Sequence, residues 1–328
     1  MPTNLPPEYF EVEERYRAAK SPAEKAELLE ELLGTIPKHK GTDKLRADLR
    51  RRLSKLKSAA QTKKGGGIRS AYQIDKEGAG QVVLVGPPNV GKSALVAALT
   101  NAAPEVDEAP YTTWTPIPGM MAIEDVQVQL IDTPPINPEF IDPEFLNLMR
   151  KADLIALVVD LQSYPIEHLE ESVDILQENG ILPCHLRERC PEERRASFKP
   201  FLVLANKADD ESFDEDFEVL CELVGEEWQL IPVSAASGRN FEGFKWAVFK
   251  QLEIVRVYAK PPGEEPDYGA PFVLKKGATV EELAGRVHKD FLENLKSARV
   301  WGSSDFEGQM VSRDYVLHDG DVVELKTF

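Results

Sequence analysis

The sequence is poor in cysteine and has no long apolar run. Its three cysteines are too few for a disulfide framework, and no C-x-x-C pair suggests a structural zinc site. No apolar stretch approaches the roughly 20 residues of a membrane-spanning helix, and the first residues lack the cationic and apolar regions of a secretory signal. We therefore expect a cytoplasmic protein with no membrane partner.

The chain is also short of positive charge. It has 39 Lys and Arg against 56 Asp and Glu, for a net charge of −17, which argues against nucleic-acid binding across the whole surface. Residues 38–69 are the exception, with twelve basic and only two acidic side chains. An acidic body with a basic arm fits an arm that contacts a phosphate backbone, although a solvated surface helix would have the same composition.

The length of 328 residues predicts two or three domains. Residues 1–72 read as a basic helical segment, with two helices in 7–35 and a third after Gly41-Thr42. The capping sequence Ser21-Pro22-Ala23-Glu24 and the leucines at 45, 49, 53 and 56 support these helices. Residues 63–67, Lys-Lys-Gly-Gly-Gly, read as a flexible linker.

Residues 73–260 alternate between short apolar runs and helical stretches. The expected strands are 82–85, 126–131, 154–159, 201–205 and 230–233, and the expected helices are 94–99, 145–151, 167–177, 213–223 and 241–252. This alternation predicts an α/β fold with a doubly wound, mainly parallel sheet that binds its ligand at the carboxyl ends of the strands. The stretch 183–200 has no clear period and reads as a surface loop.

A Pro-rich linker, 260–266, separates this part from residues 267–328. Strands are expected at 271–274, 298–301 and 322–325, with a turn at 319–321. The capping box Thr279-Val-Glu-Glu282 opens a helix between the first two strands. A small sheet packed on one helix, a β-grasp-like α+β domain, is the natural interpretation.

The motif Gly86-Pro-Pro-Asn-Val-Gly91-Lys92-Ser93 stands between an expected strand and an expected helix. In that context the pattern G-x-x-x-x-G-K-S predicts a phosphate-binding loop rather than an ordinary glycine turn. Backbone N–H groups would cradle the phosphates, Lys92 would bridge the β- and γ-phosphates, and Ser93 would hold Mg²⁺. The nucleotide-binding residues expected here are Asn89, Val90, Gly91, Lys92, Ser93 and Ala94.

Two further positions suit the magnesium side of such a site. Asp132 ends an expected strand, where the second carboxylate of the metal site belongs, although an Asp at this position is often only a turn former. Thr113, or else Thr112, can close over Mg²⁺ and the γ-phosphate from the preceding linker. Lys92, Thr113 and Asp132 are therefore the expected catalytic residues, and Ser93, Thr113 and Asp132 the expected metal ligands.

The sequence Asn206-Lys207-Ala208-Asp209 predicts a guanine site. The carboxylate of Asp209 can accept hydrogen bonds from the ring N–H and the amino group of guanine, a pair of donors that adenine lacks. Asn206 would brace the P-loop and the base, and the stem of Lys207 would cover the base. After the next strand, a backbone N–H of Ser234 or Ala235 can reach the guanine oxygen.

At these residues the chain resembles the Obg and developmentally regulated GTP-binding families. Residues 80–255 are similar to their GTPase domain, with Tyr111-Thr-Thr113 and Pro118-Gly119 as the switch-I signature, and residues 268–328 resemble a TGS domain. The resemblance implies binding of GTP and GDP with Mg²⁺, GTP hydrolysis, and work on ribosomes, translation or RNA through the basic helices and the TGS domain.

Two positions bear on the mechanism. Where these families have D-x-x-G, this chain has Asp132-Thr133-Pro134-Pro135, so the N–H that would contact the γ-phosphate is missing. The chain could therefore be a slow GTPase in which an activating protein partner or K⁺ supplies the missing contact, or an adaptor that holds GTP and scarcely hydrolyses it. Asn89 occupies the position at which related GTPases coordinate K⁺, although an asparagine there also suits a turn.

Overall fold

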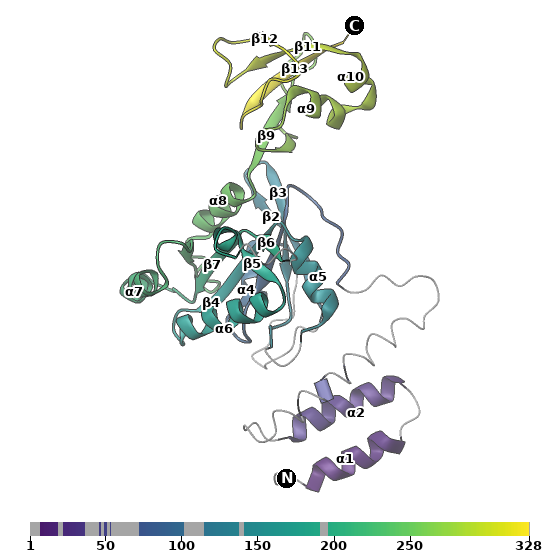
Figure 1. Ribbon diagram of the computed structural model, residues 1–328, viewed down its shortest axis with the longest axis vertical. Coiled ribbons are helices and arrows are strands. Elements are labelled where there is room, and N and C mark those ends of the chain that lie inside the picture. The colour runs from purple at the N-terminus through teal and green to yellow at the C-terminus, as the bar shows by residue number, and fades with distance from the viewer. Residues whose placement is uncertain are drawn as a thin grey trace. The chain divides into compact units, whose positions relative to one another are not determined.

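The computed structural model describes residues 7–18, 22–36, 46, 49–50, 53, 72–101, 115–137, 141–190 and 196–327. The chain forms two compact units (Figure 1). One contains Met1–Ile74 and Ile136–Met149, and the other contains Asp75–Pro135 and Arg150–Phe328.

The smaller unit contains the predicted N-terminal helices, α1 (Pro7–Ala18) and α2 (Pro22–Thr35). Their apolar side chains share one buried cluster with two helical leucines of the basic segment; the cluster contains Tyr9, Val12, Leu28, Leu29, Leu32, Ile36, Leu49 and Leu53. Of the four leucines expected at helical spacing, Leu49 and Leu53 are thus helical and buried, and Leu45 and Leu56 lie outside the described residues. Most of the basic residues, and the linker at 63–67, lie outside the described residues.

A six-stranded sheet forms the centre of the larger unit, in the order β2-β3-β1-β4-β7-β8. Its strands are β1 (Gln81–Val85), β2 (Ile117–Ile123), β3 (Val126–Asp132), β4 (Leu154–Asp160), β7 (Phe201–Asn206) and β8 (Leu230–Pro232). All neighbours are parallel except β2, which pairs antiparallel with β3. The predicted doubly wound sheet is confirmed, and β2 is an additional edge strand.

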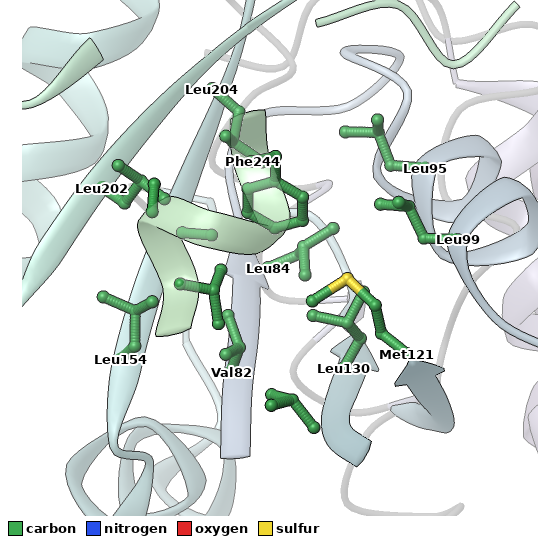
Figure 2. Packing of buried hydrophobic residues seen from close by; sticks show 14 of the residues in the cluster. Val82, Leu84, Leu95, Leu99, Met121, Leu130, Leu154, Leu202, Leu204 and Phe244 are labelled. Carbon is green, nitrogen blue, oxygen red and sulfur yellow. The ribbon is translucent and has the colours of Figure 1, made fainter. Parts of the chain in front are cut away.

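Helices connect the strands as the alternation predicted. They are α4 (Lys92–Leu99), α5 (Pro143–Lys151), α6 (Pro165–Glu178), α7 (Asp214–Val224) and α8 (Phe241–Gln251). Side chains of α4 and α8 pack on one face of the sheet in a continuous core (Figure 2). Phe244 of α8 is fully buried there among strand residues such as Leu84 and Leu202. This core fixes the strand ends that carry the predicted site.

The second sheet corrects the predicted domain boundary. Its order is β10-β9-β13-β11-β12, and its strands are β9 (Ile254–Ala259), β10 (Phe272–Lys275), β11 (Leu295–Trp301), β12 (Gln309–Val311) and β13 (Asp321–Thr327). We expected the GTPase domain to extend to residue 260, but β9 pairs with β10 and β13. The C-terminal sheet therefore begins at Ile254, before the Pro-rich segment. Helices α9 (Val280–Val287) and α10 (Lys289–Asn294) complete this domain.

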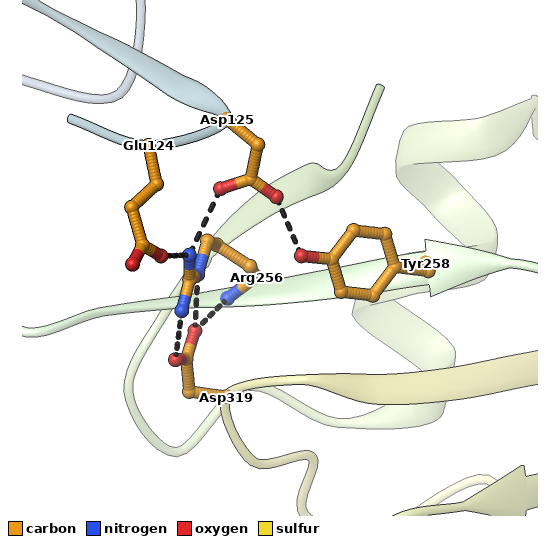
Figure 3. Close-up of polar contacts among 5 residues, drawn as sticks. All are labelled: Glu124, Asp125, Arg256, Tyr258 and Asp319. Atoms are coloured by element: carbon orange, nitrogen blue, oxygen red, sulfur yellow. Dashed lines mark hydrogen bonds and ion pairs between the residues drawn. The ribbon is translucent and has the colours of Figure 1, made fainter. Parts of the chain in front are cut away.

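One arginine of β9 joins this sheet to the turn between β2 and β3 (Figure 3). The guanidinium of Arg256 donates to Glu124 at 2.5 Å, to Asp125 at 2.9 Å and to Asp319 at 2.8 and 3.0 Å. The hydroxyl of Tyr258 donates to the other oxygen of Asp125 at 2.5 Å. Hydrogen bonds from ionised groups are stronger than neutral ones, so this network firmly links the hairpin to the C-terminal sheet.

The stretch expected as a surface loop contains regular secondary structure. It contains a short parallel pair, β5 (Ile181–Pro183) and β6 (Ser197–Lys199), and the 3₁₀ turn η1 (Cys184–Leu186). A second 3₁₀ turn, η2 (Glu211–Phe213), precedes α7. Among the helices that the structure describes, none has the length and apolar character needed to cross a membrane.

Candidate nucleotide-binding site

The segment between β1 and α4 has the conformation of a phosphate-binding loop. Gly91 adopts a φ of +92° directly before α4, and a Cβ atom there would lie 2.3 Å from Nδ2 of Asn206. A Cβ atom on Gly86 would lie 2.4 Å from the carbonyl oxygen of Val158. Both approaches are too close for any side chain, so the two motif glycines are required by the geometry of the loop.

Lys92 is buried inside this loop. Its ammonium group donates to the carbonyl oxygens of Gly86 at 2.9 Å and Pro87 at 2.8 Å. Burial lowers the pKa of Lys92 to about 8, although the carboxylate of Asp132 partly opposes this effect. Desolvation disfavours the charged form of a lysine, whereas a nearby negative charge favours it. An anion bound in the loop would therefore raise the pKa of Lys92 again and keep the ammonium group charged.

Ser93 and Asp132 meet where α4 begins and β3 ends. The hydroxyl of Ser93 donates to Oδ2 of Asp132 at 2.6 Å, and Asp132 is fully buried. The neighbouring hydroxyl of Thr133 donates to the carbonyl oxygen of Leu84 at 2.5 Å and so ties the end of β3 to β1. A hydroxyl and a carboxylate are oxygen ligands of the kind that Mg²⁺ prefers, so this pair fits the metal position expected from the sequence.

The residues expected to act as switches are described only in part. Thr112 and Thr113 lie outside the described residues, so their roles stay predictions. Pro135 is half-buried shortly after Asp132 and has no N–H to offer. Asn89 is exposed and adopts a φ of +66°, a backbone that asparagine tolerates in a turn. This conformation accounts for the asparagine without a cation, and the K⁺ role stays a prediction.

Asn206 is the last residue of β7. It joins the segment expected to bind the base, residues 206–210 (the base loop), to the phosphate-binding loop, residues 86–93 (the phosphate loop). Its Nδ2 donates to the carbonyl oxygen of Val90 at 2.8 Å, and its Oδ1 accepts the backbone N–H of Ala235 at 3.1 Å. Asn206 is 1% exposed. One buried side chain therefore holds together three segments that are far apart in sequence, and it braces the P-loop as we predicted.

Asp209 and Ser234 are also brought together. The hydroxyl of Ser234 donates to Oδ1 of Asp209 at 2.6 Å. The backbone N–H groups of Ser234 and Ala235 donate within the protein, to the carbonyl oxygen of Arg239 and to Oδ1 of Asn206. To contact a guanine oxygen, either N–H would have to bond both acceptors at once or give up its present acceptor. This contact stays a prediction.

Our sequence analysis missed three side chains that hold the base loop. Asp160 pairs with the ammonium group of Lys207, and Gln162 donates to the carbonyl oxygen of Lys207. Arg239 donates to two main-chain carbonyl oxygens of the same loop. A carboxylate at the end of a parallel strand was an available signal for Asp160, whereas no local pattern marked Gln162 or Arg239.

Two segments of the chain match known families. Residues 81–207 match the family described as 50S ribosome-binding GTPase, and residues 255–327 match the TGS domain. The first match runs from β1 into the base loop. The second begins within β9, in agreement with the pairing of that strand in the C-terminal sheet.

Several known proteins are similar to the chain over most of its length. A GTP-binding protein of Methanocaldococcus jannaschii is 30% identical over 90% of both chains. Developmentally-regulated G-protein 3 of Arabidopsis thaliana and Ribosome-interacting GTPase 1 of Saccharomyces cerevisiae are 29% and 24% identical, each over 92% of this chain and 98% of their own. The solved structure of the Schizosaccharomyces pombe YchF GTPase is 16% identical, covers 77% of this chain and all of its own, and has a TM-score of 0.51, which shows a shared fold.

Proposed function

This chain belongs to the family of developmentally regulated GTP-binding proteins with a C-terminal TGS domain, and we propose that it is a slow, Mg²⁺-dependent GTPase that acts as a switch in translation. The observation that supports the nucleotide site best is Asn206, which ties the loop of Val90 to the loop after β7. Phosphate binding and base recognition would thereby occur in one rigid site.

The side chains of the site suggest a division of labour. Lys92 and the N–H groups of its loop would bind the phosphates, and Ser93 and Asp132 would hold Mg²⁺, which neutralises charge on the β- and γ-phosphates. Asp209 would select guanine through two accepted hydrogen bonds. Thr113 would close over the γ-phosphate, and in-line attack by water would then release phosphate.

Titration with GTP, GDP and ATP tests the nucleotide assignment. We expect binding of GTP and GDP, and binding of ATP weaker by orders of magnitude. Lys92→Ala should abolish binding of nucleotide, and Asp209→Asn should shift the preference from guanine toward xanthine. Normal GTP affinity in Lys92→Ala would contradict the phosphate assignment, and retained guanine preference in Asp209→Asn would contradict the base assignment.

A second candidate is an adaptor that binds GTP and scarcely hydrolyses it. Pro135 favours this candidate, since it removes an N–H that would otherwise contact the γ-phosphate. Single-turnover hydrolysis of bound GTP, measured in K⁺ and in Na⁺, separates the two. A measurable rate would support the GTPase, and a higher rate in K⁺ would support a cation site at Asn89. A rate that rises on addition of cell extract would indicate an activating partner.

We also propose that the protein works in the cytoplasm on ribosomes or RNA. One relative is named a ribosome-interacting GTPase, and residues 38–69 form a basic segment in an otherwise acidic chain. Ribosome co-sedimentation across a salt series, with the full chain and with a chain lacking residues 1–70, tests the role of this segment. Binding that does not depend on salt or on residues 1–70 would contradict it.

A further inference from the structure

The segment between β4 and α6 contacts the base loop through Asp160 and Gln162, and neither residue has been given a part in nucleotide recognition so far. β4 and β7 are parallel neighbours, and Asp160 lies opposite Asn206 in their register. The backbone N–H of Leu161 donates to the carbonyl oxygen of Asn206 at 2.9 Å. The main chain after β4 is thus held directly against the start of the base loop.

Asp160 anchors the side chain of Lys207. Its Oδ2 lies 2.5 Å from the Lys207 ammonium group, and its Oδ1 accepts the backbone N–H of Gln162 at 3.0 Å. The Asp160 side chain is only 10% exposed, whereas that of Lys207 is 37% exposed. The main chain and the ammonium group of Lys207 are both held in place, so the methylene stem between them has one conformation. It can present an apolar surface to a flat ring.

Gln162 supports the same loop from its side-chain amide. Lys207 adopts a φ of +68°, a left-handed conformation that costs a non-glycine residue roughly 1–2 kcal/mol. The amide of Gln162 donates to the carbonyl oxygen of Lys207 at 2.8 Å. It also lies 3.4 Å from Oδ2 of Asp209. Gln162 therefore stabilises the strained residue and contacts the carboxylate that would read the base.

The hydrogen bonds to Asp209 leave a defined number of acceptor positions. A carboxylate has about four lone-pair positions, two on each oxygen. Ser234 uses one on Oδ1, and Gln162 uses one on Oδ2. One position on each oxygen is left for a ligand, which matches the ring N–H and the amino group on the edge of guanine.

We propose that Asp160 and Gln162 are positioning residues of the base site, Asp160 by fixing the stem of Lys207 beside the base and Gln162 by orienting the carboxylate of Asp209. The inference depends on the proposed function only in that the ligand is a guanine nucleotide. The two residues would affect different properties of binding. Asp160 would raise the affinity for any purine nucleotide, because the Lys207 stem contacts the ring. Gln162 would raise the preference for guanine, whose edge supplies two hydrogen-bond donors to Asp209.

Affinities for GDP and for IDP, whose base lacks the amino group of guanine, separate these roles. Isothermal titration calorimetry on the full chain should show that Gln162→Ala lowers the ratio of GDP to IDP affinity at least 3-fold. Asp160→Asn should weaken both nucleotides by a similar factor, about 5- to 20-fold, and leave their ratio unchanged. Asp160→Glu should recover part of the loss. Glu170→Gln, an exposed position on α6, serves as the control and should change neither affinity.

The outcomes distinguish this inference from the proposed function. If the unmodified protein binds neither GDP nor IDP, the proposed function fails and this inference fails with it. If the unmodified protein prefers GDP and Gln162→Ala keeps the same ratio, the role of Gln162 is wrong and the proposed function stands. Wild-type affinities in Asp160→Asn would overturn the role of Asp160 in the same way. Thermal melting of each variant shows whether a loss reflects unfolding.

Discussion

The side chain of Asn206 donates to the carbonyl oxygen of Val90, 116 residues earlier in the chain, at 2.8 Å. The two residues belong to different halves of the candidate site, the base loop and the phosphate loop. The same amide group lies so close to Gly91 that no larger residue could replace this glycine without moving it. The Asn206 side chain therefore helps to determine the conformation of the phosphate loop.

Asn206→Ala should consequently weaken binding of every nucleotide that uses the phosphate loop. It leaves the Val90 carbonyl oxygen and the Ala235 N–H without this partner, and a buried polar group left unpaired costs about 1–3 kcal/mol. Affinity for GDP should fall about 10- to 100-fold, as measured by calorimetry. Unchanged GDP affinity in a folded Asn206→Ala protein would show that the loop keeps its shape without this bond.

Lys92 should take up a proton when nucleotide binds at moderately alkaline pH. Its pKa is lowered to about 8 by burial, so much of it is neutral at pH 8.5. Phosphate groups favour the charged form and raise this pKa. GDP titrations in buffers of different ionisation enthalpy should report uptake of up to about one proton at pH 8.5.

Lys92→Arg provides the matched control for this proton uptake. A guanidinium group keeps its charge in proteins, with a pKa above about 12, so the variant should bind GDP without the uptake. Uptake of the same size in the arginine variant would assign the proton to another group.

Pro135→Gly should raise the rate of GTP hydrolysis. The substitution supplies a backbone N–H, and it frees a φ angle that proline holds near −65°. Single-turnover assays with radiolabelled GTP should show an increase of about tenfold or less, since one hydrogen bond contributes about 1 kcal/mol. Pro134→Ala is the control, because the neighbouring proline does not occupy the position of the family's glycine. Equal rates in the Pro135→Gly and wild-type proteins would mean that this proline does not limit hydrolysis.

Asp319→Asn should destabilise the protein at neutral pH and have little effect in acid. Burial alone would raise the pKa of Asp319, but hydrogen bonds from Arg256 outweigh it and hold the pKa below its usual value. The pKa of Asp125 is likewise lowered, by hydrogen bonds from Tyr258 and Arg256 that exceed the effect of burial. A lowered carboxyl pKa stabilises the folded state above about pH 4 and ceases to do so as the pH falls further.

Urea unfolding at pH 7 and at pH 3.5 measures this dependence. We expect Asp319→Asn to lose about 1–3 kcal/mol at pH 7, the range for a hydrogen bond to a charged group, and much less at pH 3.5. Glu124→Gln should have a smaller effect, because the Glu124 side chain is 53% exposed. An equal loss for Asp319→Asn at both values of pH would exclude the titration of this network as its cause.

Short motifs made much of the fold and site predictable. The P-loop and the Asn206–Asp209 motif each combine a local backbone shape with a fixed side-chain type, so sequence spacing was sufficient to place them at strand ends. β2 was not predicted, because Pro118 and Gly119 interrupt its pattern; proline is tolerated there since β2 is an edge strand.

Long-range pairing explains what the sequence analysis missed. We expected no strand at residues 254–259 and included them in the GTPase domain. Their apolar period is typical of a strand, but it does not indicate which sheet the strand joins. Asp160 and Gln162 contact the base loop only because β4 and β7 are neighbours in a particular register. Such a register depends on the whole sheet. The position of Asp160 at a strand end could mark it as a candidate, but it could not show that Asp160 contacts Lys207, and no local pattern marked Gln162.

The place of β9 also determines how the chain would respond to a protease. Residues 261–265 are exposed, and they follow β9 but precede β10. A single cut there would break the polypeptide and leave β9 hydrogen-bonded to both β10 and β13. The two fragments would remain associated like the halves of a split protein, so an intact band on a native gel would hide a nick that a denaturing gel reveals.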